Sequence, residues 1–183
     1  MITATGTATM PIKTRVYFTD ETREKASIYE SMQSAIHDLD EKAEVLADKL
    51  NDVKAEPMSA SVFKRERSRH RALLYEANIA RLKALEYLRQ SLLPAIEADR
   101  RQAMKARQSD LDAIIQTKIK GFTALGATGR NDAENMVAQL PEVRKEQASI
   151  NSLAYDDGGI KGHSLPSLIA ATRQSVIELG QAL

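Results

Sequence analysis

The chain has 183 residues, with 26 basic and 25 acidic side chains, and this balance predicts no general attraction to nucleic acid or to anionic lipid. It contains no Cys, which excludes disulfides and thiolate metal sites. No apolar run approaches the roughly 18 residues of a membrane span, and the N-terminus lacks the basic region and apolar stretch of an ordinary signal peptide. We therefore expect one helical bundle with a tail, in the cytoplasm or inside a virion.

The first 18 residues are predicted to form an extended N-terminal arm. Residues 1–11 are uncharged and rich in Thr, a composition that buries too little surface to order itself, although its alternation would suit adding a strand to a partner. Apolar and polar side chains also alternate in residues 12–18, which predicts a short strand. Thr19 and Asp20 then provide a helix N-cap.

Residues 20–53 and 59–93 predict two long amphipathic helices of nearly equal length, joined at Pro57 as an antiparallel hairpin. At 3.6 residues per turn, the apolar residues of the first helix fall within about 100° of arc. This seam comprises Ile28, Met32, Ala35, Ile36, Leu39, Ala43, Leu46, Leu50 and Val53. A narrow seam of this kind is typical of coiled-coil packing.

Charged side chains follow both helices near the joint. We define the acidic ridge of the first helix as Glu30, Glu41, Glu44 and Asp48, with His37 on the same side. We define the basic ridge of the second helix as Lys64, Arg65, Arg67, Arg69 and Arg71. From Tyr75 onward the second helix has two apolar faces, so we expect it to be covered on two sides there. Residues 42–72 should then project as a bare two-helix tip, acidic on one flank and basic on the other.

Pro94 either kinks the second helix or begins a new one. We favour a reversal, with a third helix over residues 95–120, because the first helix ends at the same level. Two arginines interrupt the apolar stripe of this third helix. The reversal would bring Arg100 and Arg107 level with Glu24 and Glu30.

The C-terminal third is predicted to be helical with two loops. Residues 121–131 form a Gly-rich break, after which Asn131 can cap a helix that kinks or restarts at Pro141. Residues 155–163 form a second loop, and the last helix spans about 164–179. We accordingly divide the chain into an arm (1–18), a hairpin with a third helix (19–124) and a C-terminal segment that packs on the bundle (125–183).

No pattern in the chain carries identifiable catalytic or metal chemistry. The segment Gly162–Pro166 falls short of a nucleophile elbow, and the loop with Asp156, Asp157 and His163 lacks the ligand spacing of a calcium site. The glycines before Arg130 are not followed by the Lys and Ser or Thr of a phosphate loop. His70 and Glu66 share an apolar face, which favours a core histidine over a titrating pair. We predict no catalytic residue, cofactor or metal.

These features favour a non-enzymatic interaction or assembly protein, such as a structural component of a phage particle or of a secretion or conjugation machine. The acidic and basic ridges could meet head-to-tail between copies or bind another protein. The alternative is an accessory nucleic-acid-binding protein that contacts phosphates through its basic ridge. A third hypothesis is an enzyme, with a pocket where the loops at 121–131 and 155–163 converge. No identifiable pair of nucleophile and base supports it.

Overall fold

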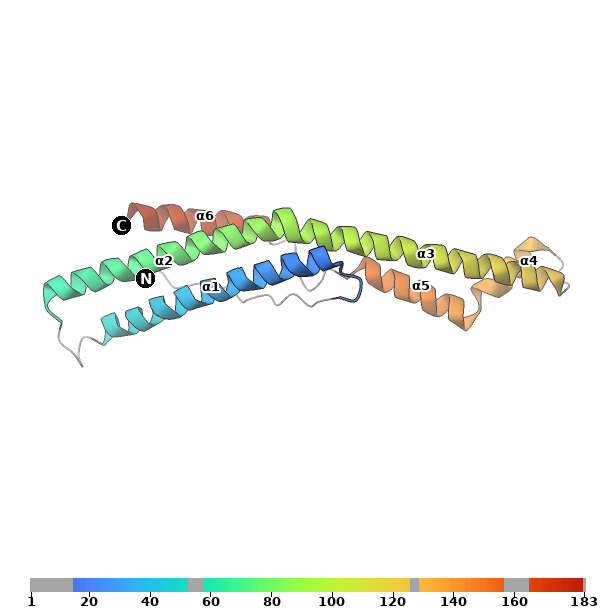
Figure 1. Cartoon of the computed structure of the whole chain (residues 1–183), viewed down its shortest axis with the longest axis horizontal. Helices are drawn as coiled ribbons and strands as arrows, with labels where there is room; N and C mark the ends of the chain where they lie inside the picture. Colours follow the sequence, from blue (N-terminus) through green and yellow to red (C-terminus); the bar gives the residue numbers. More distant parts are fainter. Residues whose placement is uncertain (1–14, 53–57, 126–128, 157–164, 183) are drawn as a thin grey trace.

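The computed structural model describes residues 15–52, 58–125, 129–156 and 165–182, and these ranges are all-α. The helices form a long rod (Figure 1). In chain order they are α1 (Asp20–Asn51), α2 (Ala60–Tyr87), the π-helical segment η1 (Leu88–Leu92), α3 (Leu93–Ala124), α4 (Arg130–Ala138), α5 (Pro141–Ala154) and α6 (Leu165–Gln181). The predicted class, an antiparallel long-helix hairpin extended into a bundle, is confirmed.

α1 and α2 are the arms of the hairpin and lie side by side with opposite directions (Figure 1). α1 begins where the sequence predicts, because the Thr19 side chain accepts a hydrogen bond from the Thr22 backbone N–H. It ends at Asn51, two residues before the predicted end. α2 begins in the same way, with the Ser59 side chain accepting from the Val62 N–H. The joint at Pro57 lies outside the described residues.

The buried seam of α1 differs from the predicted one at its N-terminal end. Thr22, Tyr29, Ile36 and Ala43 are all buried and are spaced seven residues apart. By contrast, Ile28 of the predicted seam is 43% exposed. A seven-residue spacing drifts by about 20° per repeat from the 3.6-residue period used for the prediction. Over the three repeats from Ala43 back to Thr22 this drift amounts to about 60°, so the buried line passes through Tyr29 and leaves Ile28 exposed.

The predicted reversal at Pro94 is wrong. α2, η1 and α3 form one helix of 65 residues, which corresponds to about 100 Å at ~1.5 Å per residue. Proline has no N–H, and its ring crowds the carbonyl four residues earlier. In η1, however, the Leu93 N–H donates to the carbonyl of Leu88, five residues earlier. This wider turn immediately before Pro94 makes room for the ring, so that the helix continues.

Because the helix continues, α3 leads away from α1 instead of folding beside it (Figure 1). The prediction that Arg100 and Arg107 lie level with Glu24 and Glu30 is therefore wrong as well. Both arginines reach α5 or its C-terminal end instead. Arg100 Nη1 donates to the carbonyl of Asp156 at 3.1 Å, and Arg107 donates to Ser149 Oγ.

α1 and α6 cover opposite sides of α2, as the two apolar faces of α2 predict (Figure 1). This end of the rod has one hydrophobic core, and Ala84 and Leu92 are fully buried in it. α6 contributes Leu165 and Ile169 to the same core. α6 reaches no further along α2 than Arg71, which donates to the carbonyl of Ala182. Among the described residues the hairpin is therefore thickest where the sequence predicts, and beyond Arg71 it consists of α1 and α2.

The other end of the rod has a second, smaller core. There α4 and α5 pack against α3, around Leu111 and Val137, which are 1% exposed. Two ion pairs lie at the rim of this core, Lys118 with Glu142 at 3.0 Å and Arg107 with Glu146 at 3.9 Å.

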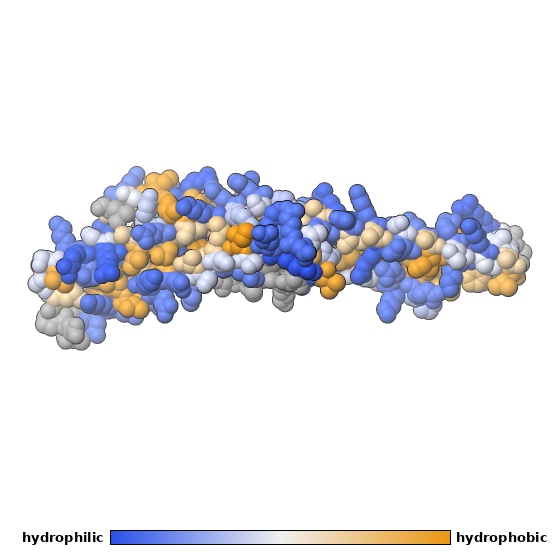
Figure 2. Space-filling view, viewed as in Figure 1, coloured by the Kyte–Doolittle hydropathy of each residue, from blue (hydrophilic) through white to orange (hydrophobic). Residues whose placement is uncertain are grey.

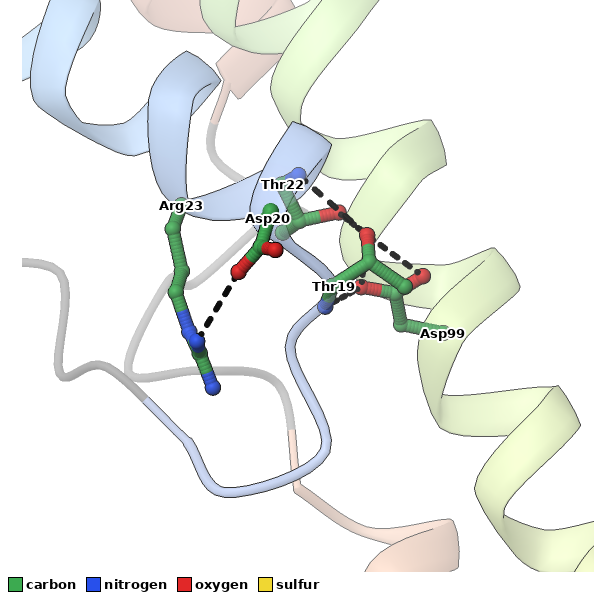
Figure 3. Close-up of polar contacts among 5 residues, drawn as sticks. All are labelled: Thr19, Asp20, Thr22, Arg23 and Asp99. Atoms are coloured by element: carbon green, nitrogen blue, oxygen red, sulfur yellow. Dashed lines mark hydrogen bonds and ion pairs between the residues drawn. The ribbon is translucent and has the colours of Figure 1, made fainter.

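A polar contact attaches the start of α1 to α3 (Figure 3). The buried carboxylate of Asp99 accepts from the Thr19 backbone N–H at 2.7 Å and from the Thr19 hydroxyl at 3.0 Å. The same hydroxyl oxygen accepts from the Thr22 N–H at 3.3 Å. Asp99 thus places a negative charge at the N-terminus of α1, where the helix dipole favours it. This contact fixes α1 lengthwise against the continuous helix.

Three local predictions need correction. Residues 15–18, the described part of the predicted strand, form a turn in which the Phe18 N–H donates to the Arg15 carbonyl. The predicted break at residue 121 begins later, because α3 runs to Ala124. α4 is capped by Gly129 instead of Asn131. Of the two alternatives predicted at Pro141, a kink or a restart, the structure shows the restart, since this residue occupies the first turn of α5. The division into three domains stays a prediction.

Candidate interaction surface at the hairpin tip

The acidic ridge lies on the outer side of α1. Its four residues, Glu30, Glu41, Glu44 and Asp48, are all exposed. Within the ranges that the structure describes, none of them forms an ion pair or a side-chain hydrogen bond. Their charge is therefore available to a partner.

The basic ridge is divided between two sides of α2. At about 100° per residue, Arg65 and Arg69 lie on one side, while Lys64, Arg67 and Arg71 lie on the other. Arg69 borders the groove between α2 and α1. Arg71 is already bound to the carbonyl of Ala182 at 3.0 Å, at the end of α6. The five residues are thus not one continuous flank, and four of them are exposed.

A groove of about 400 Å³ runs between the two arms at the tip. Its floor is apolar and its rim is mostly cationic. The residues that line it are Glu41, Lys42, Val45, Leu46, Lys49, Arg69 and Leu73. Val45 is 65% exposed, so most of this apolar side chain faces solvent beside the groove. Figure 2 shows hydrophobic and polar residues interspersed at this end of the rod.

The sequence prediction missed this groove. Lys42, Val45 and Lys49 were assigned neither to the seam nor to a ridge. The available signal was an apolar residue outside the predicted seam, flanked at three and four residues by charges of both signs. Whether such a residue lies on bare surface or beneath another helix depends on where α6 packs, and the sequence of α1 holds no information about that.

An ion pair within the seam holds the two arms in register below the tip. The guanidinium of Arg81 in α2 contacts both carboxylate oxygens of Asp40 in α1, and its other terminal nitrogen donates to Asn78 Oδ1 at 3.2 Å. The Arg81 side chain is 10% exposed, so removal of its partner would leave a buried charge. This pair makes sliding of one arm along the other unfavourable.

Glu66 and His70 occupy the seam at the tip itself. Glu66 is buried, and its nearest cation is Arg65, at 3.4 Å. Burial lowers the pKa of His70, which favours its neutral form. In the described part of the chain no hydrogen bond or ion pair joins the two side chains. This arrangement fits a partly buried histidine in a helix interface.

A second groove, of about 410 Å³, lies at the other end of the rod among α3, α4 and α5. Ile115, Val137 and Val143 form its apolar part, and Glu134 and Arg144 lie at its edge. Glu134 is already paired with Arg130 at 2.9 Å. The charges here do not form two opposed rows, in contrast to those at the tip.

Several chemical sites weighed from the sequence can be placed only in part. Asp156 is paired with Arg15 at 2.7 Å, whereas Asp157, His163 and Gly162–Ser164 lie outside the described residues. The loops at 121–131 and 155–163 do not converge in their described parts, because Asp156 contacts Arg100 while residues 121–125 lie at the far end of α3. Across the described ranges, no cluster of three or more His, Asp or Glu could hold a metal ion.

Asp156 also affects Tyr17 beside it. Burial and the Asp156 carboxylate raise the pKa of Tyr17 to about 12, so this phenol stays protonated at neutral pH. A phenol in this state is poorly suited to act as a base. The cluster of Arg15, Tyr17, Arg100 and Asp156 instead connects the chain before α1 with the end of α5.

The chain matches no known family model, no characterised protein and no solved structure. Within the described residues, none of the helices combines the length and the hydrophobicity needed to cross a membrane.

Proposed function

We propose that this protein is a non-enzymatic helical interaction and assembly protein, a structural component of a larger particle such as a phage virion or a secretion or conjugation machine. The observation that carries this proposal is the tip of the hairpin. There an exposed acidic ridge on α1 lies beside a groove with an apolar floor and a cationic rim. Charges of both signs around an apolar residue favour and orient a partner that carries the complementary arrangement.

The rest of the molecule supports the same function. A continuous helix of about 100 Å holds the tip far from the second core, as in a spacer or strut. The seam ion pair and the contact between Thr19 and Asp99 fix the position of α1 on this helix. A surface held on rigid elements loses little conformational entropy when it binds a partner.

Light scattering across a salt series tests the proposal with the full-length chain. We expect the average mass to exceed that of a monomer at high protein concentration and low salt. The mass should fall toward the monomer as salt screens the charges, because the Debye length shortens to about 8 Å at physiological ionic strength. A strict monomer at every concentration and salt would refute self-assembly.

The second candidate is an accessory nucleic-acid-binding protein. The observation that favours it is the exposure of Lys64, Arg65, Arg67 and Arg69 near one end of the rod. Cations of this kind contact phosphates without reading the sequence, and salt weakens the contact steeply.

Electrophoretic mobility with a mixed-sequence DNA duplex tests this second function. Arg65→Glu together with Arg69→Glu should abolish binding. The matched control is Lys105→Glu together with Lys120→Glu, which makes the same change of charge at exposed positions of α3. Equal binding by the two double variants would exclude the tip as a nucleic-acid site.

A further inference from the structure

The exposed side of α1 at the tip carries a regular arrangement of charges around one apolar residue. Val45 is the centre. At about 100° per residue, Glu41 and Asp48 lie about 40–60° to one side of Val45, and Lys42 and Lys49 lie about 40–60° to the other. All four are exposed. Over the two turns around Val45 the face is therefore divided lengthwise into an acidic row and a basic row, and the exposed residues Asp38 and Asp52, seven residues before and after Val45, lie on the same face at either end of these rows.

A face of this kind is complementary to itself in only one orientation. When two copies of a helix face each other in parallel about a two-fold axis along their length, the left row of each meets the right row of the other. Glu41 then meets Lys42 of the second copy, and Asp48 meets Lys49. In the antiparallel arrangement each row meets its own kind, so that like charges face each other, which is unfavourable.

We propose that α1 forms a parallel, two-fold symmetric contact with α1 of a second copy of this chain, centred on Val45. This inference rests on the proposed function and names the partner and the orientation. Both rods point the same way, and their tips lie side by side. Burial of Val45 against its counterpart supplies the apolar centre of the contact, and the two rows of charges set its direction.

The groove beside Val45 extends this contact on the basic side. Leu46 of α1 and Leu73 of α2 form its floor, and Arg69 adds a third cation to the rim beside Lys42 and Lys49. The acidic row of the second copy lies over this rim in the parallel arrangement. α6 does not obstruct the approach, because it packs on the side of α2 away from α1 (Figure 1).

The contact differs from the head-to-tail contact expected from the sequence. That contact joins α1 of one copy to the arginines of α2 in the next, and it continues into rings or filaments. The parallel contact uses the same face on both copies and therefore stops at two. Its signature is a dimer that does not form larger oligomers as the protein concentration rises.

Charge exchange between copies tests the pairing. Glu41→Lys with Asp48→Lys makes the face wholly basic, and Lys42→Glu with Lys49→Glu makes it wholly acidic. Sedimentation velocity at low salt should show that each double variant dimerises at least about tenfold more weakly than the original chain, because attractions become repulsions. An equimolar mixture of the two variants should regain the dimer, which shows that both fold.

Control variants carry the same changes of charge elsewhere. Glu76→Lys with Asp110→Lys and Lys105→Glu with Lys120→Glu alter exposed residues of α2 and α3. These variants should dimerise like the original chain.

Cysteine cross-linking tests the orientation, since the chain has no cysteine of its own. Ser34 lies on the same face as Val45, about three turns nearer the start of α1, and is exposed. Ser34→Cys should form an intermolecular disulfide in the parallel dimer. In an antiparallel dimer the two sulfurs would lie about 30 Å apart along the axis. Ser68→Cys, on the side of α2 away from α1, is the control and should not cross-link.

The outcomes separate this inference from the proposed function. Weak dimerisation of each charge variant, recovery in the mixture and the disulfide at residue 34 together support the contact. Self-association of the original chain that the charge variants leave unchanged would overturn this contact, while assembly through another surface would stand. A monomeric original chain would overturn both this contact and self-assembly, while binding of the tip to a different protein would stand.

Discussion

At one end of the 65-residue helix, α1 and α6 pack on opposite sides of α2, whereas at the other end α4 and α5 pack on α3. The helices of the second end follow one another directly in the sequence. At the first end α1 and α2 are also consecutive, but α6 begins 78 residues after α2 ends. The second end can therefore form from local contacts, but the first requires the chain to return on itself.

The two ends also differ in what their cores contain. The α3–α4–α5 core is built from Leu, Ile, Val and Ala, and its ion pairs lie at the rim. The α1–α2 seam includes the pair Asp40 and Arg81 and the buried carboxylate of Glu66. Polar groups in a seam lower stability but restrict the register of the helices. The difference indicates that polar contacts set the register of α1 against α2, whereas the packing of α4 and α5 on α3 is mainly apolar.

The largest expected effect comes from the two most buried leucines of the continuous helix. Leu92 is 0% exposed and Leu111 is 1% exposed. Leu92→Ala should lower the free energy of unfolding by about 4–5 kcal/mol and Leu111→Ala by about 2–3 kcal/mol, because Leu92 lies in the larger core. Urea denaturation followed by circular dichroism measures both. Leu125→Ala, at an 86% exposed position, is the control and should change it by less than about 0.5 kcal/mol.

Hydrogen exchange in these variants shows whether the two ends open separately. Leu111→Ala should accelerate exchange in α4 and α5 and leave α1 and α6 protected. Equal acceleration of exchange along the whole rod would show that both cores open together, and would contradict the expectation that the two ends open separately.

The seam ion pair should have the next largest effect. Asp40→Ala leaves the guanidinium of Arg81 without its carboxylate and should lower the free energy of unfolding by about 1–3 kcal/mol. The estimate stays below that for a fully buried pair, because Asp40 is 35% exposed. The double variant Asp40→Leu with Arg81→Leu should recover most of the loss. A double variant whose loss equals the sum of the losses of Asp40→Leu alone and Arg81→Leu alone would show that the residues act independently.

A smaller effect is expected where α1 is attached to α3. Asp99→Ala removes the acceptor of both Thr19 hydrogen bonds and should cost about 1–2 kcal/mol of unfolding free energy. Asp110→Ala, at an exposed position of the same helix, is the control. Hydrogen exchange should accelerate in the first turn of α1 above all. Unchanged exchange there would show that Asp99 does not hold the start of α1 on α3.

The smallest effect concerns pH at the tip. Burial lowers the pKa of His70 below its usual value of 6.5, so the unfolded chain binds a proton more readily than the folded one. Stability should therefore be fully present above pH 6.5 and should decrease as the pH falls through that value toward the lowered pKa. Urea denaturation between pH 5 and about 7.5 measures this, and His70→Gln should remove that part of the pH dependence. A His70 that titrates above 6.5 in an NMR titration would contradict the sign.

The hairpin could be predicted from the sequence because its signals are local. Thr19 and Ser59 cap the two arms, and a long apolar stripe follows each cap. The two apolar faces of α2 also indicated that two helices cover it. These features depend on residues within a few turns of one another, where helix geometry is nearly invariant.

The path of the chain after Pro94 could not be predicted in the same way. Proline usually kinks or begins a helix, but the π-helical turn of η1, closed by the hydrogen bond from the Leu93 N–H to the Leu88 carbonyl, lets this helix continue. Both a reversal and a continuation bury the stripe of α3, the first against α1 and the second against α4 and α5. The choice depends on packing between segments far apart in the sequence. The groove at the tip was missed for the same reason.

The distance between spin labels at residues 76 and 112 tests the continuous helix most directly. Both positions are exposed, and they lie 18 residues on either side of residue 94. Glu76→Cys and Asp112→Cys provide unique attachment sites, because the chain has no other cysteine. Double electron–electron resonance should give a narrow distribution near about 54 Å, the length of 36 residues of helix at ~1.5 Å each. A distance below about 20 Å would mean that the chain reverses at Pro94, and would contradict the rod and the two-ended architecture built on it.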